Sequence, residues 1–154
     1  MSNKLRVLFI CVHNSARSQM AETFLRDFAG DQFEVESAGL TPTEVNPLVI
    51  EVMDELGFDL AGNTTQSVFD LYKQGKIYDY VITVCDDAIE EECPTFPGVT
   101  NRWHWPFQDP AKAQGSHEEK LKQVRDIRDQ IKVRVENPFG QPFKIETILP
   151  GERI

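Results

Sequence analysis

A cysteine followed six positions later by an arginine is the arrangement in this sequence with the most chemical content. Cys11 ends an apolar run that starts at Leu5, and five residues separate it from Arg17 and Ser18. This pattern predicts a buried strand, a tight loop and the start of a helix. Successive backbone N–H groups converge in such a loop, and the helix dipole adds positive potential at the same place.

This setting suits nucleophilic chemistry on an oxyanion. The converging N–H groups favour the thiolate form of Cys11, and Ser18 is placed to hydrogen-bond to it. Arg17 offers a planar fork of donors that matches a tetrahedral oxyanion. We therefore predict Cys11 as the nucleophile and the following loop as the binding site. The predicted substrate-binding residues are Val12, His13, Asn14, Ser15, Ala16, Arg17 and Ser18.

A plainer interpretation is a buried structural cysteine with a surface arginine, because the Cys-x5-Arg spacing alone occurs often by chance. The strand before the loop and the amphipathic stretch after it favour the nucleophile.

Two further cysteines flank an acidic stretch. Cys85 follows a buried strand, and Cys93 lies about two helical turns beyond it. Two unrelated buried thiols are one interpretation. Zinc binding is disfavoured because no His or Cys partner repeats at zinc-finger spacing. A redox relay suits the arrangement better, and the nearby carboxylates should keep both thiols protonated until Cys11 becomes an electrophile.

Asp109 stands in a loop before a long helix and is followed by Pro110. An Asp-Pro step favours a turn that can present the carboxylate to a pocket. The residue is then a candidate general acid, and an ordinary Asx-turn is the alternative. We expect the histidines to be structural or solvent-facing rather than catalytic: His13, His104 and His117. We expect the aromatic residues Trp103, Trp105 and Phe107 to belong to the core or to a pocket wall.

Strand and helix patterns alternate along the chain, which predicts an α/β fold with a parallel sheet. We expect strands at 5–10, 33–37, 80–84 and 102–105, and helices at 18–28, 46–57, 67–73 and 116–135. Because ligand sites lie at the carboxyl ends of parallel strands, Cys11 and Cys85 should share one edge of the sheet. We expect one domain at 1–136, followed by an extension at 137–154 of unknown role with a strand-like run at 143–149.

The composition of the chain limits its possible partners and location. The 154 residues carry a formal net charge of -9, which argues against nucleic-acid and membrane-surface partners. No apolar stretch approaches membrane-spanning length, and no signal peptide is visible. We therefore expect a cytoplasmic protein, a monomer, with reactive rather than structural cysteines.

Together these residues resemble the thioredoxin-coupled arsenate reductases built on the low-molecular-weight tyrosine phosphatase fold. The resemblance rests on Cys11 to Glu22, Glu36 to Gly39, Cys85, Cys93-Pro94, and His104-Trp105 through Asp109-Pro110-Ala111, with the helix entry at Gln114-Gly115. It implies a three-layer α/β/α fold with a four-stranded parallel sheet.

The resemblance also implies a reaction. Arsenate binds the loop and Arg17, Cys11 attacks arsenic, and Asp109 protonates the departing oxygen. Cys85 then attacks the Cys11 sulfur and releases arsenite, and Cys93 takes over the disulfide. A dithiol protein, thioredoxin or a glutaredoxin, resets the enzyme.

Two departures from the family pattern concern the relay and a cation. Seven residues separate Cys85 from Cys93, whereas the family more often has six. Some members bind a potassium ion beside the loop, and Asn14, Glu22 and Ser37 match that site. The stretch 63–67 lacks the acidic residue expected there, so we expect no cofactor and no metal.

Two competing functions stay open. A low-molecular-weight protein tyrosine phosphatase shares the loop, but such enzymes usually have a second cysteine where this chain has Ala16 and an aromatic residue where it has Ala111. They also have no use for Cys85 and Cys93. A redox-sensing module is the non-enzymatic alternative, and it has no use for the general acid Asp109.

Overall fold

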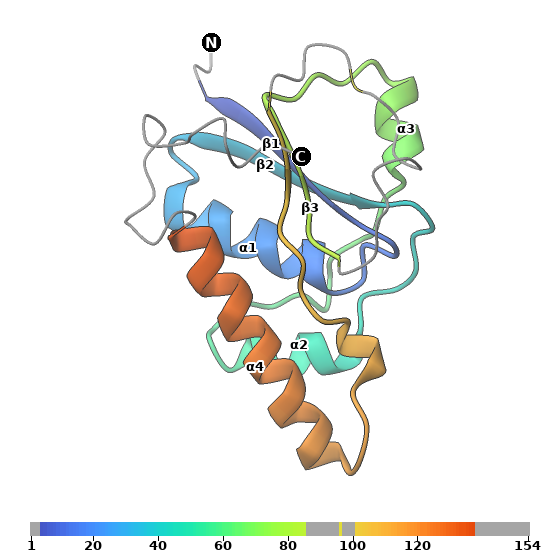
Figure 1. Ribbon diagram of the computed structural model, residues 1–154, viewed down its shortest axis with the longest axis vertical. Coiled ribbons are helices and arrows are strands. Elements are labelled where there is room, and N and C mark those ends of the chain that lie inside the picture. The colour runs from blue at the N-terminus through green and yellow to red at the C-terminus, as the bar shows by residue number, and fades with distance from the viewer. Residues whose placement is uncertain (1–3, 86–95, 97–100, 138–154) are drawn as a thin grey trace.

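The computed structural model describes residues 4–85, 96 and 101–137. Four parallel strands form one sheet in the order β2-β1-β3-β4 (Figure 1). The strands are β1 (Leu5–Cys11), β2 (Phe33–Gly39), β3 (Tyr80–Thr83) and β4 (Asn101–His104). The predicted four-stranded parallel sheet is therefore confirmed.

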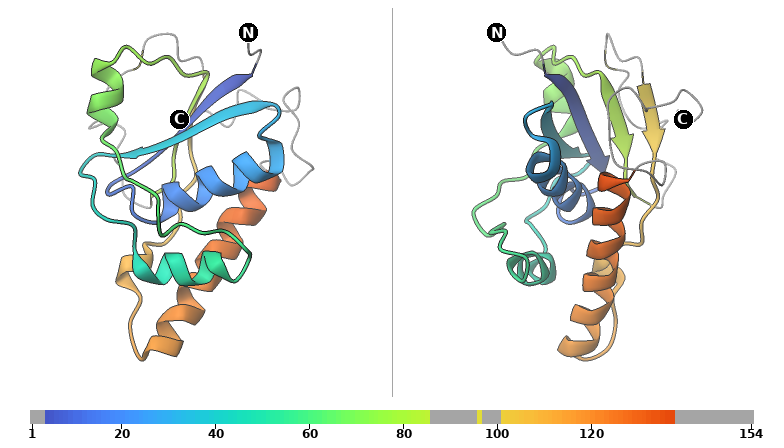
Figure 2. Two further views of the ribbon diagram at one scale, coloured as in Figure 1. Left: turned by 180° about the vertical axis from the view of Figure 1, so that it is seen from behind. Right: turned by 90° about the vertical axis from the view of Figure 1, so that its left-hand side faces the viewer.

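Helices cover both faces of this sheet. They are α1 (Arg17–Ala29), α2 (Pro47–Asp54), α3 (Val68–Lys73) and α4 (His117–Glu136), with a short 3-10 helix, η1 (Pro110–Lys112). α1 and α4 pack against each other on one side, and α2 packs on α4 (Figures 1 and 2). The connections from β1 to β2 and from β2 to β3 cross the sheet in opposite directions. Since such crossovers are right-handed, α1 and α3 belong to opposite faces.

One part of the core lies between the sheet and the α1–α4 layer. Alternate residues of each strand point to this layer because side chains alternate across a strand. They enclose an apolar space lined by Val7, Phe9, Leu25, Phe33, Tyr80, Ile82, Trp103, Trp105 and Val135. Each large side chain buried here contributes roughly 1.5–3 kcal/mol. Trp103 and Trp105 are thus core residues, as predicted.

The register brings two of the cysteines to one edge of the sheet. β1 lies between β2 and β3, with Ile10 opposite Thr83. The pairing continues past β3, since the Val84 N–H donates to the Ile10 carbonyl at 2.9 Å. Cys11 and Cys85 therefore stand at neighbouring carboxyl ends, as predicted from the sequence. Both are buried thiols.

Two helix starts follow their sequence signals. Asn46 accepts the Leu48 N–H at 2.8 Å, with Pro47 in the first turn of α2. Ser116 and Glu119 form a complete capping box at the start of α4.

Several predicted boundaries and faces are wrong in detail. β1 and β2 run one and two residues further than expected, to Cys11 and Gly39, because their ladder continues to that pair. β3 and β4 end one residue early, and α2 ends at Asp54 rather than near Gly57. Phe28 and Leu56, expected to face inward, are 43% and 41% exposed. Leu56 lies beyond the end of α2, and Phe28 lies in the last turn of α1.

Some predictions fall outside the described part of the chain. These are Cys93, the acidic residues before it and the strand-like run at 143–149. Within the described ranges, none of the helices combines the length and apolar character needed to span a bilayer.

Candidate active site

The loop between β1 and α1 turns its carbonyl groups outward. The Val12 carbonyl accepts from Thr41 N at 2.7 Å, His13 from Thr43 N at 3.0 Å, and Ser15 from Asn46 N at 2.8 Å. The N–H of each following residue points the opposite way, because a trans peptide holds its C=O and N–H antiparallel. Segment 40–46 therefore orients the loop so that N–H groups face inward.

The start of α1 is also suited to binding an oxyanion. Its N-cap residue is Ala16, which has no side-chain oxygen, and no side-chain hydrogen bond caps this end. Helix N-termini normally satisfy their first N–H groups with such a cap or with a ligand. An oxyanion in the loop would take that place and would gain from the helix dipole.

The Cys11 sulfur lies at the floor of this loop. It receives the Asn14 backbone N–H at 3.2 Å and contacts the Ser18 hydroxyl at 2.9 Å. Hydrogen bonds from such donors stabilise a thiolate more than a thiol. The contact to Ser18 is the one expected from the sequence.

Asn14 holds the turn of the loop. Its φ of 53° lies in the left-handed region, which asparagine tolerates better than most residues. Its side chain is buried and donates to Ser18 Oγ at 2.8 Å and to Ser37 Oγ at 2.9 Å. The loop is thus tied to both α1 and β2.

Gly39 lets β2 approach the loop closely. A Cβ atom built there would lie 2.7 Å from Asn14 N and 2.8 Å from both His13 C and Val12 O. All three neighbours are backbone atoms and have no freedom to move aside. The position therefore requires glycine for a steric reason.

Arg17 is oriented by the loop that follows β4. Its guanidinium is 3% exposed and donates from Nη1 to the Phe107 carbonyl at 3.0 Å. Its Nη2 lies 3.8 Å from Asp109 Oδ2. Arg17 and the candidate acid Asp109 therefore meet beside the loop of residues 12–16 (the oxyanion loop), although 92 positions separate them in the sequence.

The structure confirms the Asx-turn at Asp109, whereas its role as a general acid stays a prediction. Its Oδ1 accepts the Ala111 N–H at 2.9 Å, so it caps η1 as an ordinary Asx-turn would. Its Oδ2 is the atom turned to Arg17. The cap therefore holds the carboxylate with its other oxygen toward Arg17.

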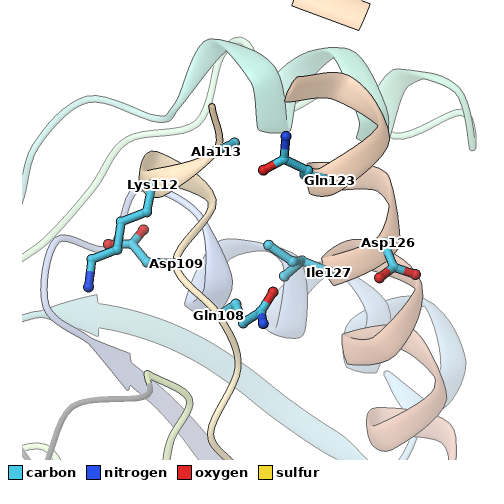
Figure 3. A pocket seen from close by; sticks show the side chains of 7 residues that line it. All are labelled: Gln108, Asp109, Lys112, Ala113, Gln123, Asp126 and Ile127. Atoms are coloured by element: carbon cyan, nitrogen blue, oxygen red, sulfur yellow. The ribbon is translucent and has the colours of Figure 1, made fainter. Parts of the chain in front are cut away.

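A hollow of about 310 Å³ opens beside Asp109 (Figure 3). It is lined by Gln108, Asp109, Lys112, Ala113, Gln123, Asp126 and Ile127. Asp109 and Lys112 project to the same side of η1, whereas Gln123 and Asp126 extend from α4. Lys112 therefore sets a positive charge near the candidate acid in a chain that is otherwise strongly acidic.

The three histidines have partners away from the Cys11 sulfur. His13 Nδ1 contacts the Thr41 carbonyl at 3.0 Å, and His104 Nδ1 contacts Thr83 Oγ1 at 2.7 Å. His117 pairs with Glu51 across the surface.

Sequence reasoning missed several residues that shape the site. Gln66 donates its backbone N–H to Asn14 Oδ1 at 3.0 Å, and Gln19 donates to the same oxygen at 3.4 Å. The Phe107 carbonyl anchors Arg17. Among the missed residues, only Arg26 could have been found from the sequence. It stands four residues after Glu22 on one helix, a spacing that favours an ion pair, and the structure shows this pair.

The side chains of Asn14, Glu22 and Ser37, where the family resemblance implies a potassium ion, have protein partners in the structure. Asn14 Oδ1 is engaged by Gln66, and one Glu22 oxygen accepts the Ser37 hydroxyl. The other Glu22 oxygen binds the Arg26 guanidinium, so a cation of the protein already stands beside the carboxylate. In the ranges that the structure covers, no group of three His, Cys, Asp or Glu side chains could hold a metal ion.

Comparison with known proteins agrees with this geometry. The family model described as low molecular weight phosphotyrosine protein phosphatase matches residues 6–141. An arsenate reductase from Shouchella clausii (strain KSM-K16) is 40% identical over 136 residues, covering 88% of this chain and 94% of the relative.

Solved structures agree as well. One described as an arsenate reductase in the phosphate binding state has a TM-score of 0.73 at 32% identity, covering 87% of this chain and 95% of the other. The thioredoxin-dependent arsenate reductase Cg_ArsC1' of Corynebacterium glutamicum has a TM-score of 0.59 at 29% identity, covering 88% of this chain and 64% of its own. The chain therefore belongs to the low molecular weight phosphotyrosine protein phosphatase family, in the group of its arsenate reductases.

Proposed function

We propose that this chain is an arsenate reductase that works through the thiols of Cys11, Cys85 and Cys93. The observation that carries the proposal is the environment of Cys11. Its sulfur receives the Asn14 N–H in the loop that leads directly to Arg17, the Arg17 guanidinium lies 3.8 Å from Asp109, and the buried thiol Cys85 stands at the same sheet edge.

In the first step the Cys11 thiolate attacks arsenic of the bound arsenate. The loop N–H groups and Arg17 stabilise the charge on the remaining oxygens. Asp109 gives its proton to the oxygen that leaves as water, and a sulfur–arsenic(V) bond forms.

In the second step Cys85 attacks the Cys11 sulfur. A Cys11–Cys85 disulfide forms, the sulfur–arsenic bond breaks, and its electron pair stays on arsenic as arsenite. Cys93 then attacks Cys85, which releases Cys11 as a thiolate and leaves a Cys85–Cys93 disulfide. Two thiols have thereby supplied the two electrons that arsenic received.

A dithiol protein closes the cycle by reducing the Cys85–Cys93 disulfide. Thioredoxin is the reductant we propose, with a glutaredoxin as the alternative. The relative from Corynebacterium glutamicum is described as thioredoxin-dependent, which supports this choice. We further propose that the protein acts as a monomer in the cytoplasm, where thiols are kept reduced.

The test is NADPH consumption with arsenate, thioredoxin and thioredoxin reductase, for the wild type and Cys93→Ser. Wild type should turn over, whereas Cys93→Ser should stop after about one equivalent of arsenite, because its disulfide stays at Cys11–Cys85.

Phosphatase activity is the second candidate, because Arg17, Asp109 and the loop suit phosphate as well as arsenate. A pocket shaped for one of two near-isosteric oxyanions discriminates weakly against the other. If neither protein consumes NADPH while both hydrolyse a phenyl phosphate, the relay is wrong and the chain is a phosphatase.

A further inference from the structure

We propose that Glu22 and Arg26 are positioning residues for the nucleophile. Arg26 acts as a built-in counterion for Glu22, and Glu22 acts through Ser37 and Asn14 to direct the Ser18 hydroxyl proton toward Cys11. The protein then needs no free monovalent cation at this place. The inference deepens the proposed function, since it concerns how the same Cys11 is activated.

The first step of the argument is the orientation of the Asn14 amide. Its Oδ1 must be the atom that faces Gln66, because a backbone N–H can only donate. The Gln19 Nε2 that also reaches this oxygen is fixed in turn by the Thr64 carbonyl, to which it donates at 3.2 Å. Asn14 Nδ2 therefore faces the two serines and donates to both.

The second step is the direction of the two serine hydroxyls. Each accepts one proton of the Asn14 amide, so each has its own proton to give elsewhere. Ser37 donates to Glu22 Oε1, which can only accept while ionised. Ser18 contacts the Cys11 sulfur at 2.9 Å, and its proton completes that contact when Cys11 is a thiolate.

The third step concerns the charge at the far end of this chain of bonds. The Glu22 side chain is only 17% exposed, and a carboxylate at such a site needs a counter-charge. Arg26, one helical turn later on α1, binds its other oxygen and also donates to the Val35 carbonyl at 2.8 Å. The guanidinium is thus held on α1 and β2 at once.

Arg26 lines a hollow that a dissolved cation could otherwise enter. This hollow has a volume of about 330 Å³. It is lined by Gln19, Glu22, Arg26, Ser37, Gly62, Asn63, Thr64 and Gln66. Most of these side chains carry oxygen, and Glu22 is the acidic one, so a small monovalent cation could replace the guanidinium if Arg26 were removed.

The test follows the reactivity of Cys11 in a Cys85→Ser, Cys93→Ser background, where iodoacetamide has one thiol to alkylate. Rates are measured across pH in potassium chloride and in choline chloride at equal ionic strength. In Arg26→Gln the unpaired Glu22 charge disfavours the thiolate, so the rate at neutral pH in choline should fall by about threefold to tenfold. Potassium should restore much of it, whereas the Arg26 parent should respond equally to both salts.

Two variants serve as controls. Arg26→Lys keeps the charge and should behave like the parent. Lys132→Gln removes the same charge from an i,i+4 pair with Glu136 on α4, far from the loop, and should change nothing. The neighbouring groups His13, Arg17 and Asp109 are identical in all variants.

A potassium-specific response of the parent, or an Arg26→Gln profile that matches Lys132→Gln, would overturn the proposal. Alkylation needs neither arsenate nor thioredoxin, so this outcome is independent of whether the chain reduces arsenate. Circular dichroism of each variant confirms that it is folded before rates are compared.

Discussion

At the scale of residues, the proposed nucleophile, anion-binding arginine and acid each have a contact that holds them in place. Cys11 is fixed by Asn14 and Ser18, and Arg17 by the Phe107 carbonyl. Asp109 is held by its bond to the Ala111 N–H. Such fixed groups lower the cost of reorganisation when charge develops in the transition state.

Asp109→Asn separates proton donation from thiol chemistry. The amide retains an oxygen that can cap η1, so the loop should keep its shape, but it cannot protonate a leaving oxygen. We expect arsenate turnover to fall by about 10²-fold or more. Disulfide formation by peroxide should be unchanged, because it needs no such proton. Steady-state rates measure arsenate turnover, and a thiol count after peroxide treatment measures disulfide formation. Unchanged turnover would show that Asp109 is not the general acid.

At the scale of elements, the oxyanion loop has the shape that β2 and segment 40–46 impose on it. Gly39 has no side chain, so β2 can contact the backbone of the loop. The backbone N–H groups of Thr41, Thr43 and Asn46 donate to the carbonyl groups of the loop. The inward direction of the N–H groups therefore depends on chain outside the Cys-x5-Arg motif.

Gly39→Ala tests this dependence. A Cβ at 2.7 Å from Asn14 N must displace the loop, at a cost of roughly 1–3 kcal/mol. We expect a lower midpoint of thermal unfolding and a smaller upward shift of that midpoint on adding phosphate, read by differential scanning fluorimetry. A phosphate shift equal to that of the wild type would show that the loop tolerates the methyl group.

The contact between α2 and α4 carries a pH-dependent ion pair. Hydrogen bonds from Arg125, at 2.7 and 2.9 Å, and from Arg128 lower the pKa of Glu55 from 4.5 to about 2. A lowered pKa means that the stabilisation is complete above pH 4.5 and is lost as the pH falls from there toward 2.

Glu55→Gln should therefore destabilise the protein at neutral pH. The partly exposed carboxylate is screened by water, so we expect a loss of about 1 kcal/mol. Urea denaturation at several pH values measures it. The difference between wild type and variant should shrink as the pH drops below 4.5, and a constant difference would mean that the Glu55 charge contributes nothing.

At the scale of the whole molecule, the net charge of -9 works against an anionic substrate. The negative field of the protein repels arsenate at long range. We therefore expect arsenate to be bound by local groups such as Arg17 and the N–H groups of the loop. Dissolved salt screens the long-range repulsion more than the contacts within the buried site.

The kcat/KM for arsenate should therefore rise modestly, by less than about threefold, as ionic strength increases. Choline chloride is the suitable salt, because neither of its ions resembles the substrate. A steep fall of kcat/KM with salt would instead mean that attraction by surface cations such as Lys112 outweighs the net charge.

The sequence by itself determined the order of elements, the parallel sheet and the placing of Cys11 and Cys85 at one edge. These follow from local patterns: an apolar run ending in cysteine, the caps at Asn46 and Ser116, and the rule that parallel strands end together. The residue types and the family motifs also led to the roles proposed for Arg17 and Asp109.

Only the tertiary structure decided which distant groups meet. The contacts of Arg17 with Phe107 and of Asn14 with Gln66 join positions that are 90 and 52 residues apart, and no periodic pattern encodes such a pairing. Strand ends also escaped prediction, because hydrogen bonds to a neighbouring strand set them. The contacts of Arg26 with the Val35 carbonyl and of Glu22 with Ser37 depend on the packing of α1 on β2, which the sequence of the helix does not show.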